Sequence, residues 1–271
     1  MNLNQAIWEK GDFTRIAASM RESGEALVGT LGVKKGLKIL DLGCGDGTTA
    51  LPSAKLGGDV LGVDIARNLV EAGNRRAREF GLANLRFQHG DATNLSQLPD
   101  NTFDLVISMF GAMFAPKPFD VASEMVRVTR TGGRIVMGNW IPNDPTLVAQ
   151  ILKISAAYTP PPPAGFISPM TWGVEANVIE RFASAGVPQD GITFSRDTYR
   201  FNFDGSPSGL VDLFLSYYGP TMNAFEEAAK NGRADALKKE LYALFESQNT
   251  AARKDVTSIP ATFLRVTVAV N

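Results

Sequence analysis

The chain contains very few of the residues that most often build metal and redox sites. Its 271 residues include a single cysteine, Cys44, and a single histidine, His89. One cysteine excludes an intrachain disulfide and a zinc site built from several cysteines, and it is compatible with a reducing compartment. We therefore expect no bound metal and a cytoplasmic location.

Long runs of one kind of residue are also absent. Lys plus Arg number 27 against 28 Asp plus Glu, the net charge is -1, and no block of five or six like charges occurs. This balance does not support strong nonspecific binding to nucleic acid. No apolar run reaches the roughly 18 to 20 residues that span a bilayer, and the first residues lack the pattern of a signal peptide. We expect no nucleic-acid partner and no membrane insertion, while homodimer formation is left open.

The most informative stretch is a glycine-rich turn in residues 39–48, with the sequence ILDLGCGDGT. Its apolar start predicts a buried strand, and its glycines let a ligand approach the backbone closely. The dinucleotide fingerprint requires a glycine where Thr48 stands, which disfavours a nicotinamide cofactor. The Asp41 carboxylate beside the turn would repel a pyrophosphate and attract an ammonium or sulfonium group. The turn therefore favours a cationic nucleoside ligand.

Strand and helix patterns alternate around this turn. Strands are expected at 37–42, 59–64, 85–89, 103–108 and 134–139, with helices from residue 48 or 49, over 67–80 and near 120–128. Strands rich in Val, Ile and Leu that alternate with helices indicate a parallel sheet covered on both faces. Ligands of such sheets bind beyond the carboxyl ends of the strands. Asp41, Asp64, Asp91 and Ser108 all stand at predicted strand ends.

The remaining segments predict a cover, a cap and two further strands. Residues 12–31 have the apolar spacing of an amphipathic helix that could cover the ligand. The proline-rich stretch 140–172, with four prolines at 160–163, is interpreted as a rigid inserted cap rather than an SH3-type ligand. Strands at 193–203 and 262–270, separated by helices within 206–245, would complete a seven-stranded sheet.

Further acidic residues follow the glycine turn at positions that complete a recognisable series of motifs. Asp64 could accept both hydroxyl hydrogens of a ribose, or it could merely cap the following helix. Residues 90–92 (GDA) and 108–110 (SMF) follow in the same order. In these motifs the chain resembles class I S-adenosylmethionine-dependent methyltransferases, whose first motif matches residues 39–47. More loosely, through 108–116, 138–140 and 217–220, it resembles bacterial small-molecule enzymes related to the ubiquinone and menaquinone biosynthesis C-methyltransferases.

The resemblance implies a fold, a cofactor and a set of binding residues. The implied fold is α/β: a Rossmann-like, mostly parallel sheet of seven strands with an antiparallel last strand, helices on both faces and a helical, proline-rich cap. One domain, 1–271, would comprise an N-terminal helical cover (1–34), a cofactor-binding core (35–139), a cap insertion (140–190) and C-terminal strands with a helical insertion (191–271). The cofactor would be S-adenosylmethionine, leaving as S-adenosylhomocysteine, held by Asp41, Gly43, Cys44, Gly45, Asp64, Ile65, Gly90, Asp91, Ala92, Ser108, Met109 and Phe110.

The acceptor side is less defined by the sequence. Methyl transfer is an in-line displacement that needs a general base only if the nucleophile must lose a proton. Catalytic residues are therefore left unassigned, with Tyr217, Tyr218 and His89 as candidates, although a histidine without a catalytic role is favoured at position 89. Tyr158 and Tyr199 are further tyrosines that could accept a proton or line the substrate site. Residues expected to contact substrate, with core packing as the alternative, are Met113, Trp140, Trp172, Tyr217 and Tyr218.

These patterns favour methyl transfer to a small, aromatic or otherwise apolar metabolite. The chain lacks the Pro-Pro-aromatic motif of enzymes that methylate amino groups of nucleic acids or glutamine, and it lacks the cysteines needed for pyrimidine C5 or arsenite methylation. A noncatalytic S-adenosylmethionine-binding or scaffold protein is the alternative, and a methyltransferase acting on a lipid quinone precursor ranks lower. The acceptor, the methylated atom and the pathway are left open.

Overall fold

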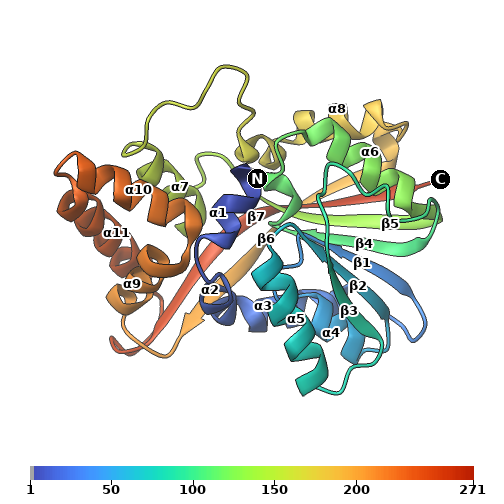
Figure 1. Cartoon of the computed structure of the whole chain (residues 1–271), viewed down its shortest axis with the longest axis horizontal. Helices are drawn as coiled ribbons and strands as arrows, with labels where there is room; N and C mark the ends of the chain where they lie inside the picture. The colour runs from blue at the N-terminus through green and yellow to red at the C-terminus, as the bar shows by residue number, and fades with distance from the viewer. Residues whose placement is uncertain (1–2) are drawn as a thin grey trace.

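The computed structural model describes residues 3–271, in which seven strands form one sheet (Figure 1). The strands are β1 (Lys38–Leu42), β2 (Asp59–Asp64), β3 (Leu85–His89), β4 (Phe103–Met109), β5 (Thr129–Trp140), β6 (Ile192–Phe203) and β7 (Thr257–Val270). Their order is β3-β2-β1-β4-β5-β7-β6. Strands β1 to β5 pair in parallel, whereas β7 is antiparallel to both β5 and β6. The predicted fold class is confirmed.

Helices cover both faces of the sheet. Neighbouring strand residues point to opposite sides, so each face presents apolar side chains that need a covering layer. Leu40, Val106 and Ile135 belong to one apolar core, together with buried residues of α6 (Pro118–Val128) and α8 (Glu175–Ser184). The residues that precede or follow them, including Ile39 and Leu105, pack into a second core with α4 (Ala50–Lys55) and α5 (Arg67–Glu79). These central strands are thus apolar on both sides, as expected for a buried parallel sheet.

A separate layer of helices lies beyond one end of the sheet (Figure 1). It consists of α7 (Leu147–Ala156), α9 (Pro207–Tyr217), α10 (Gly219–Lys230) and α11 (Ala234–Gln248), which pack against one another. α9 starts with a strong local signal, since the Ser206 hydroxyl accepts the Gly209 N–H at 3.2 Å and Pro207 occupies the first helical position. No helix within residues 3–271 is long and apolar enough to cross a membrane.

Residues 140–190 divide between this helical layer and the sheet. α7 joins the layer, whereas the 3₁₀ turn η3 (Pro169–Gly173) returns to β5 and α8 packs on α6. The four prolines at 160–163 lie in the irregular connection between α7 and η3. The segment predicted as one cap therefore serves two parts of the fold.

The N-terminal cover is built from several short helices instead of the single helix predicted over 12–31. These are α1 (Leu3–Glu9), α2 (Thr14–Ala17), the 3₁₀ turn η1 (Ala18–Met20) and α3 (Arg21–Thr30). Two separate attachments explain the break at η1. α2 buries Ile16 in the large core, while Gly24 of α3 lies so close to Thr48 that a Cβ would come within 2.5 Å of that side chain.

The pair β6–β7 extends well past its neighbour in the sheet. β5 ends at Trp140, opposite Phe263, but β6 and β7 remain paired as far as Phe203 and Thr257. The sequence predicted β6 over 193–203 but β7 only from residue 262, so the β7 half of this extension was missed. It carries Tyr199 and Phe201 of β6 beyond the carboxyl edge of the parallel strands, toward the helical layer.

The glycine turn after β1 packs directly against the backbone that follows β4. A Cβ on Gly111 would lie 2.3 Å from the Gly43 carbonyl oxygen. We therefore expect Gly111→Ala to destabilise the protein by about 1 to 3 kcal/mol, because backbone cannot move aside as a flexible side chain would. Chemical denaturation measures this change.

A second glycine provides the matched control for that experiment. Gly29 lies in α3 and is exposed, and a Cβ there meets no atom within 4 Å. Gly29→Ala should leave stability unchanged or raise it by up to about 1 kcal/mol through helix propensity. Equal effects of the two substitutions would contradict the close approach at Gly111.

Candidate functional site

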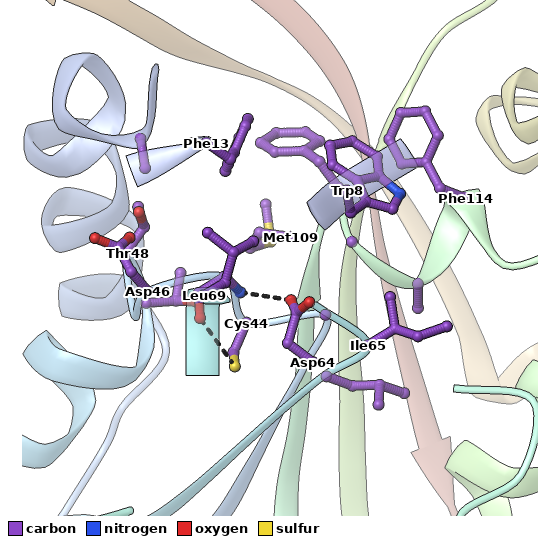
Figure 2. A pocket seen from close by; sticks show the side chains of 18 of the residues that line it. Trp8, Phe13, Cys44, Asp46, Thr48, Asp64, Ile65, Leu69, Met109 and Phe114 are labelled. Carbon is purple, nitrogen blue, oxygen red and sulfur yellow. Dashed lines mark hydrogen bonds between the residues drawn. The ribbon is translucent and has the colours of Figure 1, made fainter. Parts of the chain in front are cut away.

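A cavity lies at the carboxyl ends of the parallel strands, beneath the N-terminal helices and beside the helical layer (Figure 2). It encloses about 1150 Å³ of space free of protein atoms, its mouth included. Residues from the turn after β1 and from the ends of β2, β3 and β4 form one end. Aromatic side chains from the N-terminal helices, β5, β6 and α9 surround the other. This position at the carboxyl ends of the strands suits a nucleoside cofactor, and the aromatic wall beside it suits a second, apolar ligand.

The glycine turn presents its backbone to this cavity. Gly43, Cys44 and Gly45 all line the wall, and the N–H groups of the first two donate to the Val63 carbonyl oxygen at 2.7 and 3.2 Å. Gly43 and Gly45 have φ angles of 68° and 55°, the left-handed region that favours glycine. A Cβ on Gly45 would have only Phe13 within 4 Å, at 3.9 Å, so this glycine keeps space open for a ligand.

Asp64, at the end of the neighbouring strand β2, is hydrogen-bonded to the glycine turn. One carboxylate oxygen accepts the Gly45 N–H at 2.8 Å (Figure 2) and the other accepts the Ala66 N–H at 2.9 Å, just before α5. Burial raises the pKa of this carboxyl group, whereas the backbone hydrogen bonds oppose the rise. Asp64 and Ile65 both line the cavity. Each carboxylate oxygen has further lone pairs, so Asp64 can hold the turn and still accept ribose hydroxyls.

The residues predicted to contact adenine follow the end of β3. Gly90, Asp91 and Ala92 all line the cavity. One carboxylate oxygen of Asp91 accepts both the N–H and the hydroxyl of Thr93, at 2.9 and 2.8 Å. These bonds define a tight local turn that fixes the direction of the aspartate side chain.

Asp41 lies behind the turn and does not line the cavity. Its carboxylate accepts the Thr49 hydroxyl at 2.5 Å, and Thr49 in turn borders the cavity. Burial raises the pKa of Asp41 to about 7, with the Thr49 bond opposing the rise and the charge of Asp64 adding to it. Any contact between Asp41 and the cofactor therefore passes through neighbouring groups.

The raised pKa of Asp41 predicts a pH dependence of stability. Between about 4, the ordinary value, and about 7, the folded protein holds a proton that the unfolded chain releases. Stability should consequently fall as pH rises through this window and level off above it. Asp41→Asn should remove this contribution and be more stable than the parent at pH 8, by an amount on the order of a few kcal/mol. Denaturation of both proteins without cofactor at pH 4 to 8 measures it, and parallel curves would refute the assignment.

Asp46, in the same turn, was not assigned a role from the sequence. Its buried carboxylate lies 2.6 Å from the Arg21 guanidinium of α3 and 3.4 Å from that of Arg76 in α5. Arg76 also donates to the Asp46 carbonyl oxygen at 2.6 Å. An aspartate inside a glycine turn is usually read as a turn former, and neither arginine stands out in the sequence. The ion pairs attach the N-terminal cover to the cofactor loop.

The end of β4 places one predicted residue behind the cavity and two beside it. The Ser108 hydroxyl donates to the Leu42 carbonyl oxygen at 2.7 Å and accepts the Ala112 N–H at 3.0 Å, so it ties β4 to β1 without lining the cavity. Met109 and Phe110 do line it. Phe110 has a φ of 62°, which is unusual for a bulky residue, and its ring stacks on Trp140 with centroids 3.7 Å apart.

Some of the residues predicted for catalysis or substrate binding line the cavity, and others do not. Trp140 and Tyr218 line the cavity, whereas Trp172, Met113, Tyr217 and His89 do not. Trp172 is buried against α8, with the Arg181 guanidinium 4.5 Å from its ring. Met113 is buried in the core after β4, Tyr217 faces Arg15, and His89 ends β3 opposite Asp64. Trp172, Met113 and Tyr217 are each held by contacts outside the cavity.

Several aromatic walls of the cavity were not predicted as site residues. Trp8 of α1 packs edge-on against Phe13, Phe114 and Tyr218, with ring centroids 5.8, 5.0 and 5.9 Å apart. Figure 2 labels Trp8, Phe13 and Phe114. Phe201 and Phe214 are further walls of this kind, and Tyr199, which the sequence suggested as a possible substrate contact, also lines the cavity. The alternation of aromatic residues at 199, 201 and 203 is the signal that could have found the β6 face.

The charged groups of the cavity gather at one end. Among the described residues that line it, the acidic ones are Asp46, Asp64 and Asp91, and none is His, Lys, Arg or Glu. At the aromatic end the titratable side chains are Tyr199 and Tyr218, and burial raises the pKa of each phenol well above its usual value. Neither tyrosine is therefore a phenolate at neutral pH, and this end offers no strong general base.

Comparisons with known proteins agree with this geometry. A sequence profile described as a methyltransferase domain matches residues 40–137. An uncharacterized protein of Mycobacterium tuberculosis is 32% identical over 84% of this chain and 81% of its own length. A demethylmenaquinone methyltransferase of a Geobacillus species is 41% identical over 39% of this chain and 46% of its own length. The crystal structure of the YcgJ protein of Bacillus subtilis superposes with a TM-score of 0.58 at 19% identity, over 92% of this chain and 99% of that one.

Fold, site and relatives together define a Rossmann-like domain that binds a nucleoside cofactor and carries a methyltransferase core. The chain belongs to the class I S-adenosylmethionine-dependent methyltransferases, and its cofactor is S-adenosylmethionine. The predicted family, enzyme class and cofactor are confirmed.

Proposed function

We propose that this methyltransferase acts on a small, aromatic or otherwise apolar metabolite. The observation that carries the proposal is the aromatic end of the cavity, where Trp140, Phe201 and Phe214 lie without a charged neighbour on the wall. Aromatic rings recognise planar apolar ligands through area and ring geometry, and few polar groups are needed to orient such a ligand. The lone, buried Cys44 also supports the proposed cytoplasmic location.

The protein contributes mainly binding and orientation to the reaction. When bound, S-adenosylmethionine supplies an electrophilic methyl group on a sulfonium centre. The turn from Gly43 to Gly45 would hold its amino-acid end, Asp64 its ribose and Asp91 its adenine. Alignment of two reactants in a closed site can lower a barrier by about 7 to 11 kcal/mol in favourable systems. Trp8 and Phe13, which line the cavity, would limit the access of water to this site.

The lack of a strong base restricts the acceptor chemistry. With only neutral phenols at the aromatic end, the protein does not itself remove a tightly held proton from the nucleophile. Suitable nucleophiles therefore ionise readily in water or need no deprotonation before attack, such as acidic phenols, neutral amines and electron-rich ring carbons. Simple aliphatic alcohols are disfavoured.

Transfer of labelled methyl groups tests the proposal. The protein is incubated with methyl-labelled S-adenosylmethionine and separate panels of naphthols, aromatic amines, aliphatic alcohols and isoprenoid-substituted hydroquinones, and products are identified by mass spectrometry. Product from the small aromatic panel, at rates well above the aliphatic panel, is the expected result. Gly45→Val, in which the side chain fills the open side of the turn, is the negative control. Preference for the isoprenoid panel would instead favour a lipid quinone precursor as substrate.

A further inference from the structure

One buried hydroxyl beside the cavity lacks a hydrogen-bond partner among residues 3–271. Tyr199 is 1% exposed, and its hydroxyl makes no hydrogen bond to any described residue. Nearly all buried polar groups in proteins are hydrogen-bonded, so such an exception requires an explanation. Of the described side chains with a buried, unpaired polar atom, only Tyr199 and Asp46 line the cavity, and Asp46 belongs to the cofactor turn. Among the described residues, Tyr199 is thus the cavity-lining side chain outside the cofactor turn that has an unpaired buried polar atom.

The ring of Tyr199 is held firmly in place. It packs edge-on against Phe110, with centroids 5.0 Å apart and planes at 88°, and against Phe263, at 5.5 Å and 82°. The extension of β6 past β5 brings it to this position. Phenylalanine would make the same ring contacts without burying an unpaired hydroxyl. The hydroxyl therefore serves something other than packing.

The protonation state of Tyr199 defines what its hydroxyl can do. Burial raises the pKa of the phenol, and the charges of Asp41 and Asp197 raise it further. The phenol consequently keeps its proton at neutral pH. It can donate a hydrogen bond but is a poor general base.

We propose that Tyr199 is the positioning residue for the methyl acceptor, donating a hydrogen bond from its hydroxyl to an oxygen atom of an aromatic ligand. This inference rests on the proposed function and narrows its substrate class to oxygen-bearing aromatics, such as phenols and aromatic ketones. An oxygen anchored to a rigid donor fixes the orientation of the aromatic ring in an otherwise featureless apolar pocket. Aromatic hydrocarbons of the same shape fit the walls but lack this anchor.

Binding of a matched pair of probes tests the proposal. The affinities of 1-naphthol and naphthalene are measured by fluorescence with protein saturated with S-adenosylhomocysteine. The parent protein should bind 1-naphthol about tenfold more tightly than naphthalene, the effect of one hydrogen bond at a buried site. Tyr199→Phe should abolish this preference by weakening 1-naphthol binding while leaving naphthalene affinity within about twofold. Tyr242→Phe, which removes a tyrosine hydroxyl that lies outside the cavity and donates to Asp212, is the matched control and should retain the preference.

Stability measurements separate a ligand-directed hydroxyl from a structural one. Ligand-free Tyr199→Phe should melt at the same or a higher temperature than the parent, because an unpaired buried group is removed. A clear drop in Tm would show that the hydroxyl has a partner within the protein and would overturn the proposal.

The outcomes also distinguish this inference from the function on which it rests. Failure of S-adenosylhomocysteine to bind would defeat the proposed function itself. If S-adenosylhomocysteine binds but Tyr199→Phe keeps the preference for 1-naphthol, the role of Tyr199 is refuted and the proposed function stands. If the loaded parent protein binds 1-naphthol no better than naphthalene, the oxygen-bearing substrate class is refuted.

Discussion

Replacing Asp64 with alanine should weaken binding of S-adenosylhomocysteine by more than about 100-fold, or roughly 3 kcal/mol. Two losses combine in this expectation. The variant lacks the carboxylate proposed to accept the ribose hydroxyls, and it leaves the N–H groups of Gly45 and Ala66 without their partner. Because Gly45 belongs to the cofactor turn, the second loss also loosens the wall against which the cofactor lies. Titration calorimetry with S-adenosylhomocysteine measures the affinity.

A second aspartate of the same strand provides the control for Asp64. Asp59 starts β2, at the end away from the cavity, and is exposed. Asp59→Ala should bind S-adenosylhomocysteine with the parent affinity. Circular dichroism establishes that both variants are folded. Parent-like affinity in folded Asp64→Ala would exclude the ribose assignment, whichever way the control behaves.

The cofactor half of the site was predictable because its signals are local in sequence. Each strand end carries its own candidate binding residue, and the parallel sheet brings the ends together whatever follows later in the chain. Gly43, Asp64 and Asp91 were therefore found within about fifty residues of one another without any knowledge of long-range contacts. Only Asp41 and Ser108 lie behind the wall, since a motif does not tell which way a strand-end side chain points.

The acceptor half could not be predicted in this way because its walls come from distant segments. Trp8, Phe201 and Phe214 come to line one cavity only after the N-terminal helices, the β6–β7 extension and α9 have been placed. Trp172 shows the converse error. Its place in a proline-rich insertion suggested a cap over the substrate, but η3 returns to the sheet and buries the ring against Phe182 and Arg181. Composition does not determine the direction in which an insertion folds.

The ion pairs of Asp46 lead to the largest expected change in stability. Asp46→Ala should lower the free energy of unfolding by about 2 to 4 kcal/mol, because it leaves the partly buried guanidinium groups of Arg21 and Arg76 without their carboxylate. The partial exposure of both arginines keeps the figure below that of a fully buried pair. Urea denaturation measures it, and Asp255→Asn, which breaks an ion pair on the exposed surface, should change stability by less than about 0.5 kcal/mol.

A double-mutant cycle shows whether this loss arises from the ion pair with Arg21. Removing both Asp46 and Arg21 should destabilise the protein by at least about 1 kcal/mol less than the sum of the single substitutions, since neither charge is then left alone. Arg21 begins α3, so the same pair holds the N-terminal cover on the cofactor turn. Asp46→Ala should accordingly also bind S-adenosylhomocysteine more weakly, although the acidic residue of the first motif is Asp41 and not Asp46. Strictly additive stabilities would show that the two residues act independently and that the cover is held by its apolar contacts alone.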